Sequence, residues 1–240
     1  MKHKPLHTTR FFFATPPLPC PYIPGKMERR VVSELVGRDA SILHYGLSMA
    51  GFRRSHSIAY APACPDCTAC VAVRVVVGDF IPSRSQRRVR NRNREIQVME
   101  LPARATEEQF TLFGKYQSSR HDGGDMEKMD FQDYLAMVED TPVETVLVEF
   151  RDGGGDLIGV CLSDFVVDGM SAVYSFFDPT LHRQSLGTFM IMWLIEKAKG
   201  LNLENLYLGF WIADCSKMEY KKYFQPLQGH TPEGWRTLNI

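Results

Sequence analysis

The sequence predicts a mixed α/β protein: a carboxyl-terminal mixed sheet with helices, preceded by a cysteine-containing amino-terminal domain. Runs of β-branched residues bounded by turn residues are typical of strands. Longer segments with apolar residues at helical spacing alternate with these runs in the second half. Three of the six cysteines lie within seven residues of the first half. We therefore expect two domains, residues 1–103 and residues 104–240.

Composition excludes several classes of protein. No stretch approaches the roughly 20 apolar residues of a membrane span, and the proline-containing start lacks the apolar core of a signal peptide. We therefore expect a cytoplasmic protein with no membrane partner. The 28 basic and 28 acidic side chains are unevenly placed, because residues 1–100 hold 16 basic and 7 acidic ones. Either the two halves attract each other, or the basic half binds a polyanion.

The first half is expected to be mainly extended. Residues 11–25 are too rich in proline for a helix or a central strand. The apolar spacing of residues 28–43 suits a short helix, and residues 52–60 are expected to be extended. The β-branched residues 71–77 predict a buried strand. Residues 84–94 follow as a surface segment.

The second half is expected to alternate helices with strands. Thr106 is a suitable N-cap, with acidic residues in the first turn, and Gly200 is a suitable stop for a long apolar helix. The expected elements are helices at 106–119, 131–138, 186–198 and 216–224, and strands at 143–150, 157–167, 170–177 and 206–212. The strand at 170–177 should pair antiparallel with the strand at 157–167.

The cysteines of the first half are candidate metal ligands. Cys64, Cys67 and Cys70 have the spacing C-x2-C-x2-C, which lets thiolates converge on one ion or on one face of an iron–sulfur cluster. Cys20, held between two prolines, is the candidate for a fourth ligand. Their crowding argues against ordinary disulfides. The alternative is a set of small buried thiols without metal.

Residues 84–94 hold six arginines and no acidic residue. Guanidinium groups suit phosphate oxygens, and such a density of them gives nucleic-acid affinity that depends on salt. A solvated surface with no partner is the alternative. The candidate contacts to nucleic acid are Arg84, Arg87, Arg88, Arg90 and Arg92.

The loop before the helix at 186–198 is a candidate ligand site. A strand, an Asp-Pro pair, a turn and a long helix in this order resemble the acyltransferase fold, in which backbone amides at a helix start hold the donor's phosphates. Ser185, Leu186 and Gly187 occupy the helix start. The coenzyme A version of this loop usually has a second glycine, which is absent here. This departure counts against coenzyme A, and a plain structural turn remains the alternative.

A series of motifs runs in order through residues 11 to 226. They include residues 20–25 (CPYIPG), 51–55 (GFRRS), 64–70 (CPDCTAC), 87–88 (RR), 120–121 (RH), 177–179 (FDP), 185–187 (SLG), 207–212 (YLGFWI) and 217–221 (KMEYK). Together these motifs resemble the arginyl-tRNA-protein transferase family. The bacterial branch, the aspartate/glutamate leucyltransferases, matches best.

The resemblance implies an enzyme that moves leucine from leucyl-tRNA to the α-amine of proteins that begin with Asp or Glu. The product would carry an N-end rule degradation signal. The resemblance also implies an acetyltransferase-like (GNAT-like) fold for the second half and tRNA as the ligand of the arginines. The transfer needs no cofactor and no coenzyme A, while the four cysteines would hold an iron–sulfur cluster or zinc.

The chemistry makes modest demands on the site. The acceptor α-amine has an unperturbed pKa of about 7.7 to 8.0, so part of it is neutral at pH 7 without a strong base. Catalysis can rest on orientation and on stabilisation of the oxyanion. We expect Asp178 to orient or deprotonate the amine, with Tyr174 as its hydrogen-bond partner; a turn aspartate is the alternative. The candidate partners of the acidic acceptor side chain are Arg53, Arg54, Arg120 and His121.

Three other functions remain open at this point. An enzyme that catalyses the same reaction with arginyl-tRNA as donor would differ only in the side chains that line one pocket. An acyl-coenzyme A N-acetyltransferase would share the fold of the second half. A redox-sensing nucleic-acid-binding protein would bind tRNA without transferring its amino acid.

Overall fold

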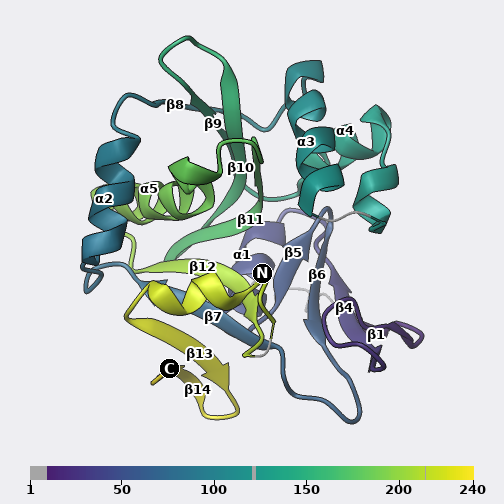
Figure 1. Ribbon diagram of the computed structural model, residues 1–240. Coiled ribbons are helices and arrows are strands. Elements are labelled where there is room, and N and C mark those ends of the chain that lie inside the picture. Colours follow the sequence, from purple (N-terminus) through teal and green to yellow (C-terminus); the bar gives the residue numbers. More distant parts are fainter. Residues whose placement is uncertain (1–9, 121–122, 214) are drawn as a thin grey trace, which may run out of the picture.

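The computed structural model describes residues 10–120, 123–213 and 215–240. Its main feature is an eight-stranded mixed sheet (Figure 1). In spatial order the strands are β14 (Gly234–Thr237), β13 (Leu227–Thr231), β7 (Val71–Val76), β12 (Asn205–Trp211), β11 (Gly169–Phe177), β10 (Leu157–Val166), β9 (Thr145–Arg151) and β8 (Gln97–Pro102).

A smaller sheet and a two-stranded ladder come from the first 62 residues. The small sheet has the order β1 (Phe13–Ala14), β4 (Arg30–Glu34), β6 (Ile58–Pro62) and β5 (Arg53–Ser55), and β2 (Leu18–Pro19) pairs with β3 (Met27–Glu28). The helices are α1 (Ala40–Met49), α2 (Arg84–Arg92), α3 (Glu107–Arg120), α4 (Phe131–Glu139) and α5 (Leu186–Gly200). Short 3-10 helices are η1 (Asp125–Lys128), η2 (His182–Gln184) and η3 (Glu219–Tyr223).

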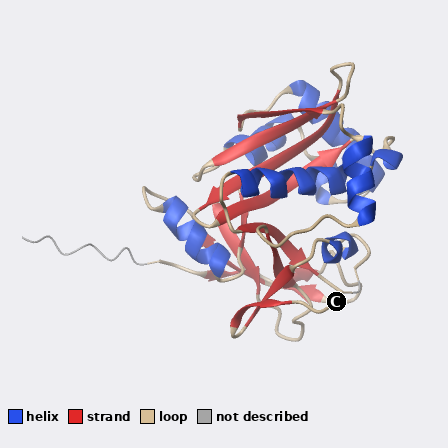
Figure 2. Ribbon diagram, turned by 90° about the vertical axis from the view of Figure 1, so that its left-hand side faces the viewer, coloured by secondary structure: helices blue, strands red, loops and turns tan. Residues whose placement is uncertain are grey.

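Helices pack against both faces of the large sheet (Figures 1 and 2). Because successive side chains of a strand point to opposite faces, neighbours in β9 enter different cores. Val148 contributes to the core that contains α5, whereas Leu147 contributes to the core that contains α3 and α4. Within the described residues, no helix has both the length and the apolar character to cross a membrane.

Most of the predicted elements are confirmed, including the mixed α/β class. The helices at 106–119, 131–138 and 186–198 correspond to α3, α4 and α5, and β10 pairs antiparallel with β11 as expected. The helix expected at 28–43 is wrong. Val31 and Val32, which are β-branched, lie in β4 instead, and α1 begins only at Ala40, after a turn at Gly37 with φ +82°.

One addition and one further correction concern segments that later form the site. Residues 84–94 contain the helix α2, whose N-terminus has a reciprocal capping box between Ser83 and Gln86. The amphipathic helix expected at 216–224 is reduced to the 3-10 helix η3. The sequence also gave no indication of β8, β13 and β14.

The expected boundary near residue 103 does not divide the structure. β7 and β8 precede that boundary, yet both belong to the large sheet. β7 pairs with β12 on one side and with β13 on the other, so its backbone hydrogen bonds depend on residues from the end of the chain. The first half therefore supplies an interior strand of the second half's sheet.

The centre of the large sheet contains a gap. β11 and β12 are parallel neighbours, but they pair only from Gly169↔Asn205 to Ser171↔Tyr207. Both strands are irregular just beyond this point, because the register shifts between Leu162 and Ser163 in the β10–β11 ladder and between Tyr207 and Gly209 in the β12–β7 ladder. Such bulges bend strands. Two parallel strands that separate after a short pairing, with α5 following the first of them, give the expected acetyltransferase-like fold.

Candidate functional site

A cavity of about 600 Å³ opens beside the carboxyl-terminal end of β11. Its walls come from the end of α3, the end of β11, the loop through η2 into the first turn of α5, and residues 216–220. This volume lies in the range of pockets that bind small molecules or parts of larger ligands. The cavity is therefore the candidate site.

The cavity is cationic. The positively charged Arg120 and Lys217 line it, and the described lining residues include no aspartate or glutamate. The rest of its lining combines hydroxyl groups with the apolar side chains of Leu181, Leu186 and other residues. Such a site favours a ligand that carries both negative charge and an apolar group.

The first turn of α5 faces the cavity, as expected for Ser185, Leu186 and Gly187. Ser185 adopts a left-handed backbone conformation with φ +53°, and no side chain caps the helix start. The amides of this turn therefore lack intrahelical partners and carry the positive end of the helix dipole. A Cβ on Gly187 would lie 3.1 Å from the ring of Phe177, so the glycine allows the helix start to pack closely against β11.

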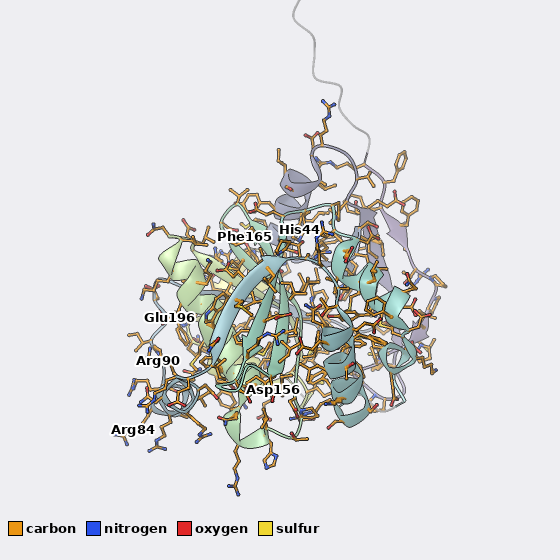
Figure 3. All side chains as sticks on the ribbon, turned by 90° about the horizontal axis from the view of Figure 1, so that it is seen from above. His44, Arg84, Arg90, Asp156, Phe165 and Glu196 are labelled. Carbon is orange, nitrogen blue, oxygen red and sulfur yellow. The ribbon has the colours of Figure 1, made fainter. Side chains whose placement is uncertain are left out.

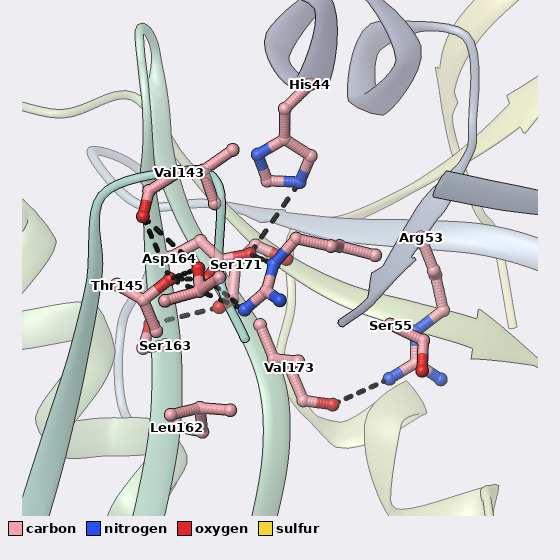
Figure 4. Close-up of polar contacts among 12 residues, drawn as sticks. His44, Arg53, Ser55, Val143, Thr145, Leu162, Ser163, Asp164, Ser171 and Val173 are labelled. Atoms are coloured by element: carbon pink, nitrogen blue, oxygen red, sulfur yellow. Dashed lines mark hydrogen bonds and ion pairs between the residues drawn. The ribbon is translucent and has the colours of Figure 1, made fainter. Parts of the chain in front are cut away.

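Two basic side chains donate hydrogen bonds to the separated edges of β11 and β12. Arg53 Nη2 donates to the carbonyl of Val173 in β11 at 3.0 Å (Figure 4). Lys221 Nζ donates to the carbonyl of Phe210 in β12 at 2.5 Å. Buried carbonyls need such partners when the neighbouring strand is absent. Burial, and then the charge of Arg53, lowers the pKa of Lys221 well below its ordinary value.

Gly209 makes room for Arg53, and we expect Gly209→Ala to disturb this arrangement. The backbone of Gly209 has φ +74°, and a Cβ there would lie 2.4 Å from Arg53 Nε. The left-handed conformation alone costs an alanine about 1–2 kcal/mol. We expect chemical denaturation to show at least this loss in the free energy of unfolding.

Gly153→Ala is the matched control, because a Cβ at Gly153 meets nothing within 4 Å. Equal stability of the two variants would contradict the close approach of Arg53 to Gly209.

Tyr220 is a site residue that received no role from the sequence. It lines the cavity and keeps 42% of its surface exposed. The surrounding protein raises the pKa of Tyr220 to about 12, chiefly by desolvation. Its hydroxyl therefore keeps its proton at neutral pH and can donate to an oxygen that gains negative charge. The 217–221 motif was the signal that could have identified it.

Asp178 and Tyr174 are not hydrogen-bonded to each other. Asp178 Oδ1 accepts from the amide of Thr180 at 2.8 Å and from its hydroxyl at 2.6 Å. Tyr174 Oη accepts from Gln117 Nε2 in α3 at 2.7 Å. Burial raises the pKa of Tyr174 to about 12. This placement of Asp178 favours the turn role over the role in proton transfer, which stays a prediction.

We accordingly expect Asp178→Asn to retain most of the activity of the protein. An asparagine Oδ1 can accept the same two hydrogen bonds from Thr180, so the turn before the cavity should persist. If Asp178 transferred the proton, its replacement by a neutral side chain would instead lower kcat by about 10²–10⁴-fold. Steady-state kinetics distinguish these results, and a loss of that size would show that Asp178 acts on the amine.

The four proposed partners of an acidic acceptor occupy different places. Arg120 lines the cavity, whereas Arg53 lies between β11 and β12. Arg54 is 3% exposed and makes a two-point ion pair with Asp164, so its guanidinium is engaged inside the protein. His121 lies outside the described residues. Of the three that the structure describes, Arg120 is the one that lines the cavity.

The predicted nucleic-acid contacts lie on α2. All five of them are exposed, and Figure 3 shows Arg84 and Arg90 projecting from one edge of the molecule. Arg87 Nη1 donates to the carbonyl of Pro82, and Arg92 Nη1 donates to the carbonyl of Arg183. Arg183 belongs to η2, whose neighbours line the cavity. The arginine face and the cavity are therefore adjacent.

The four candidate metal ligands surround a second, smaller cavity. Cys20, Cys64, Cys67 and Cys70 all line it as free thiols. Burial, followed by the three other thiols, raises the pKa of Cys70 to about 11. Across the described residues, however, no three His, Cys, Asp or Glu side chains have an arrangement that could hold a metal ion. The thiols gather as expected, but they would have to move closer together to coordinate one.

Models of one protein family match both halves of the chain. "Arginine-tRNA-protein transferase, N terminus" matches residues 18–88, and "Arginine-tRNA-protein transferase, C terminus" matches residues 108–231. The first match contains the cysteines 64–70 and part of the arginine helix. The second contains all of the described residues that line the larger cavity.

Curated relatives match nearly the whole chain. A protein of Paramagnetospirillum magneticum is 56% identical over 236 residues, which are 98% of this chain and 97% of the relative. One of Rhodospirillum rubrum is 50% identical, over 98% of this chain and 96% of the relative. Both are named aspartate/glutamate leucyltransferase. Among solved structures, L-PGS from Bacillus licheniformis has a TM-score of 0.48 and 11% identity, covering 75% of this chain and 52% of its own.

Proposed function

The chain belongs to the arginyl-tRNA-protein transferase family and is an aminoacyltransferase, and on this basis we propose that it transfers leucine from leucyl-tRNA to proteins that begin with Asp or Glu. The observation that carries the proposal is the cationic cavity beside the arginine helix. The positive charges of its lining favour an anionic ligand, and an aminoacylated tRNA presents phosphates next to its aminoacyl ester. We propose the cytoplasm as the place of the reaction, because charged tRNA is available there.

The lining of the cavity favours leucine over arginine as the donated residue. Leu181, Leu186, Ile191 and Phe177 supply apolar surface for an aliphatic side chain. An arginine side chain would instead meet Arg120 and Lys217 without a carboxylate among the described lining residues to balance its charge. The names of the relatives agree with this choice.

The residues of the cavity suit the proposed chemistry. The α-amine of the acceptor attacks the ester carbonyl carbon; the C–N bond forms, the ester C–O bond breaks, and the amine proton passes to the departing ribose hydroxyl. Free amides at the start of α5 would hold a terminal phosphate. Tyr220 would donate to the oxyanion, and Arg120 with Lys217 would hold the acidic side chain of the acceptor. The site thus acts by orientation and electrostatics.

The test is transfer of labelled leucine from leucyl-tRNA to peptides that begin with Asp, Glu or Ala. We expect label on the Asp and Glu peptides alone, and we expect RNase treatment or free leucine in place of leucyl-tRNA to abolish it. Transfer from arginyl-tRNA instead would overturn the donor, and transfer to the Ala peptide would overturn the acceptor. Leucine at the N-terminus of the product would then be the proposed degradation signal.

We also propose that the four cysteines bind a metal ion or an iron–sulfur cluster when their cavity contracts. Sulfur donors of this number suit zinc or iron. Cys67→Ser should lower the metal content of anaerobically purified protein, as measured by elemental analysis. The buried Cys161, changed to Ser, is the matched control outside the cavity. Equal metal content in the wild type and in Cys67→Ser would contradict this proposal.

A further inference from the structure

The arginine helix α2 is fixed at its amino-terminal end to one wall of the cavity. Gln86 is 4% exposed, and its Nε2 donates to the carbonyl of Tyr223 at 3.0 Å. Its Oε1 accepts from the amide of Ser83 at 2.8 Å, so the same side chain also caps the helix. Tyr223 is the last residue of η3, the short helix that carries Tyr220. One buried amide therefore joins α2 to this wall.

The carboxyl-terminal end of α2 is fixed to a second wall of the cavity. Asn93, which follows α2 and is 2% exposed, donates from Nδ2 to the carbonyl of Val89 at 3.0 Å and to the carbonyl of Gln184 at 2.8 Å. Gln184 ends η2 and directly precedes Ser185 at the start of α5. A second buried amide thus connects α2 to the loop that holds the helix start.

The helix α2 has two distinct surfaces, and both contacts lie on the inner one. Its outer surface carries exposed arginines that suit phosphates, and its inner surface packs beside α5 (Figure 1). Burying an amide is unfavourable unless it is hydrogen-bonded, so apolar residues would suffice if this inner surface served packing alone. Gln86 and Asn93 instead each make a directional bond to a different wall of the cavity.

We propose that α2 couples RNA binding to the geometry of the cavity, with Gln86 and Asn93 as positioning residues. This inference rests on the proposed tRNA-dependent transfer. Phosphates held on the outer surface would fix α2, and the two amides would then fix η3 and the η2–α5 loop. Binding energy from the body of the tRNA would thereby order the walls before the transfer step.

The experiment compares two donors of the same leucyl ester. One is full-length leucyl-tRNA, and the other is leucine esterified to the trinucleotide CCA, which lacks the body of the tRNA. For each donor we would measure kcat with an Asp-initiated peptide, and tRNA affinity would be measured separately at fixed salt. The variants are Asn93→Ala and Gln86→Ala. Asn91→Ala, the same change as the first at an exposed position of α2, is the control.

Coupling predicts that the wild type has a higher kcat with full-length tRNA than with the trinucleotide donor. In each variant the ratio of the two kcat values should fall about tenfold, which is the effect of one hydrogen bond of ordinary strength. Its tRNA affinity should stay within about twofold, because the arginines remain. Asn91→Ala should resemble the wild type in both. Gln86 and Asn93 contact different walls of the cavity. If one of the two variants does not fold, the other is therefore sufficient to test the inference.

Two results would overturn the coupling. An equal fall in kcat with both donors would show that the amides only stabilise the cavity, and unchanged ratios in both variants would show that they transmit nothing. Absence of transfer by the wild type is a separate result, because it would reject the proposed function itself. Melting temperatures measured in parallel identify a variant that does not fold.

Discussion

Asp164→Asn is expected to lower the free energy of unfolding by about 3–5 kcal/mol, which is the usual cost of removing one partner of a buried ion pair. Arg54 Nε and Nη2 each donate to a carboxylate oxygen of Asp164 at 2.6 Å, and the Asp164 side chain has no exposed surface. Thr145 donates to the same carboxylate at 2.7 Å. A neutral asparagine would leave the charge of Arg54 buried without a counterion. Denaturant titration of the purified variant measures this loss.

Asp125→Asn is the matched control for this prediction. Asp125 pairs with Lys128 on the surface, where both side chains are largely exposed, so the same change should shift the stability by less than about 1 kcal/mol. The double variant Arg54→Met/Asp164→Leu should recover part of the loss, because it removes both charges together. A loss in Asp164→Asn as small as that of the surface control would mean that the pair does not hold β5 against the large sheet.

The second large effect is expected from the arginine helix. The side chains of Arg84, Arg88 and Arg90 are exposed, so we expect them to bind phosphates of the tRNA. Changing all three to glutamine should weaken tRNA binding roughly 100-fold at low salt, at about 1 kcal/mol for each charge-assisted contact. The slope of log affinity against log salt should fall by about 2 to 3, because each phosphate contact contributes about 0.7 to 0.9.

Binding is to be measured at several salt concentrations, with leucine transfer recorded beside it. The triple variant Arg10→Gln/Arg38→Gln/Arg104→Gln makes the same change in net charge at exposed positions outside α2. It should keep a slope close to that of the wild type. Equal slopes for the two triple variants would show that the helix attracts RNA only through the overall charge of the protein.

The sequence predicted those parts of the fold whose signals are local. The β-branched run at 71–77 and the apolar helix at 186–198 depend on neighbouring residues, and both are confirmed. The helix α2 was missed because its arginines leave no apolar periodicity, although Ser83 and Gln86 have the spacing of a capping box. In η3, contacts with the rest of the protein outweighed the helical pattern of residues 216–224.

The site was predicted only where one short segment forms it. The start of α5 could be identified because neighbouring residues alone, a turn followed by a long apolar segment, predict a helix start. Arg54, by contrast, pairs with Asp164, which lies 110 residues away in the sequence, and no local pattern predicts this contact. The same holds for Arg53, whose role follows from the separation of β11 and β12. Such long-range pairings decide which guanidinium groups can reach a ligand.

The position of β7 has a consequence for how the protein is made. β7 leaves the ribosome about 130 residues before β12 and still longer before β13, yet it lies between them in the finished sheet. At about 5–20 residues per second it waits roughly 6 to 26 s for its first partner. An unpaired β-branched strand invites intermolecular pairing during that time. Slow synthesis of the last third of the chain should therefore lower the yield of native protein, and chaperones that cover nascent strands should restore it.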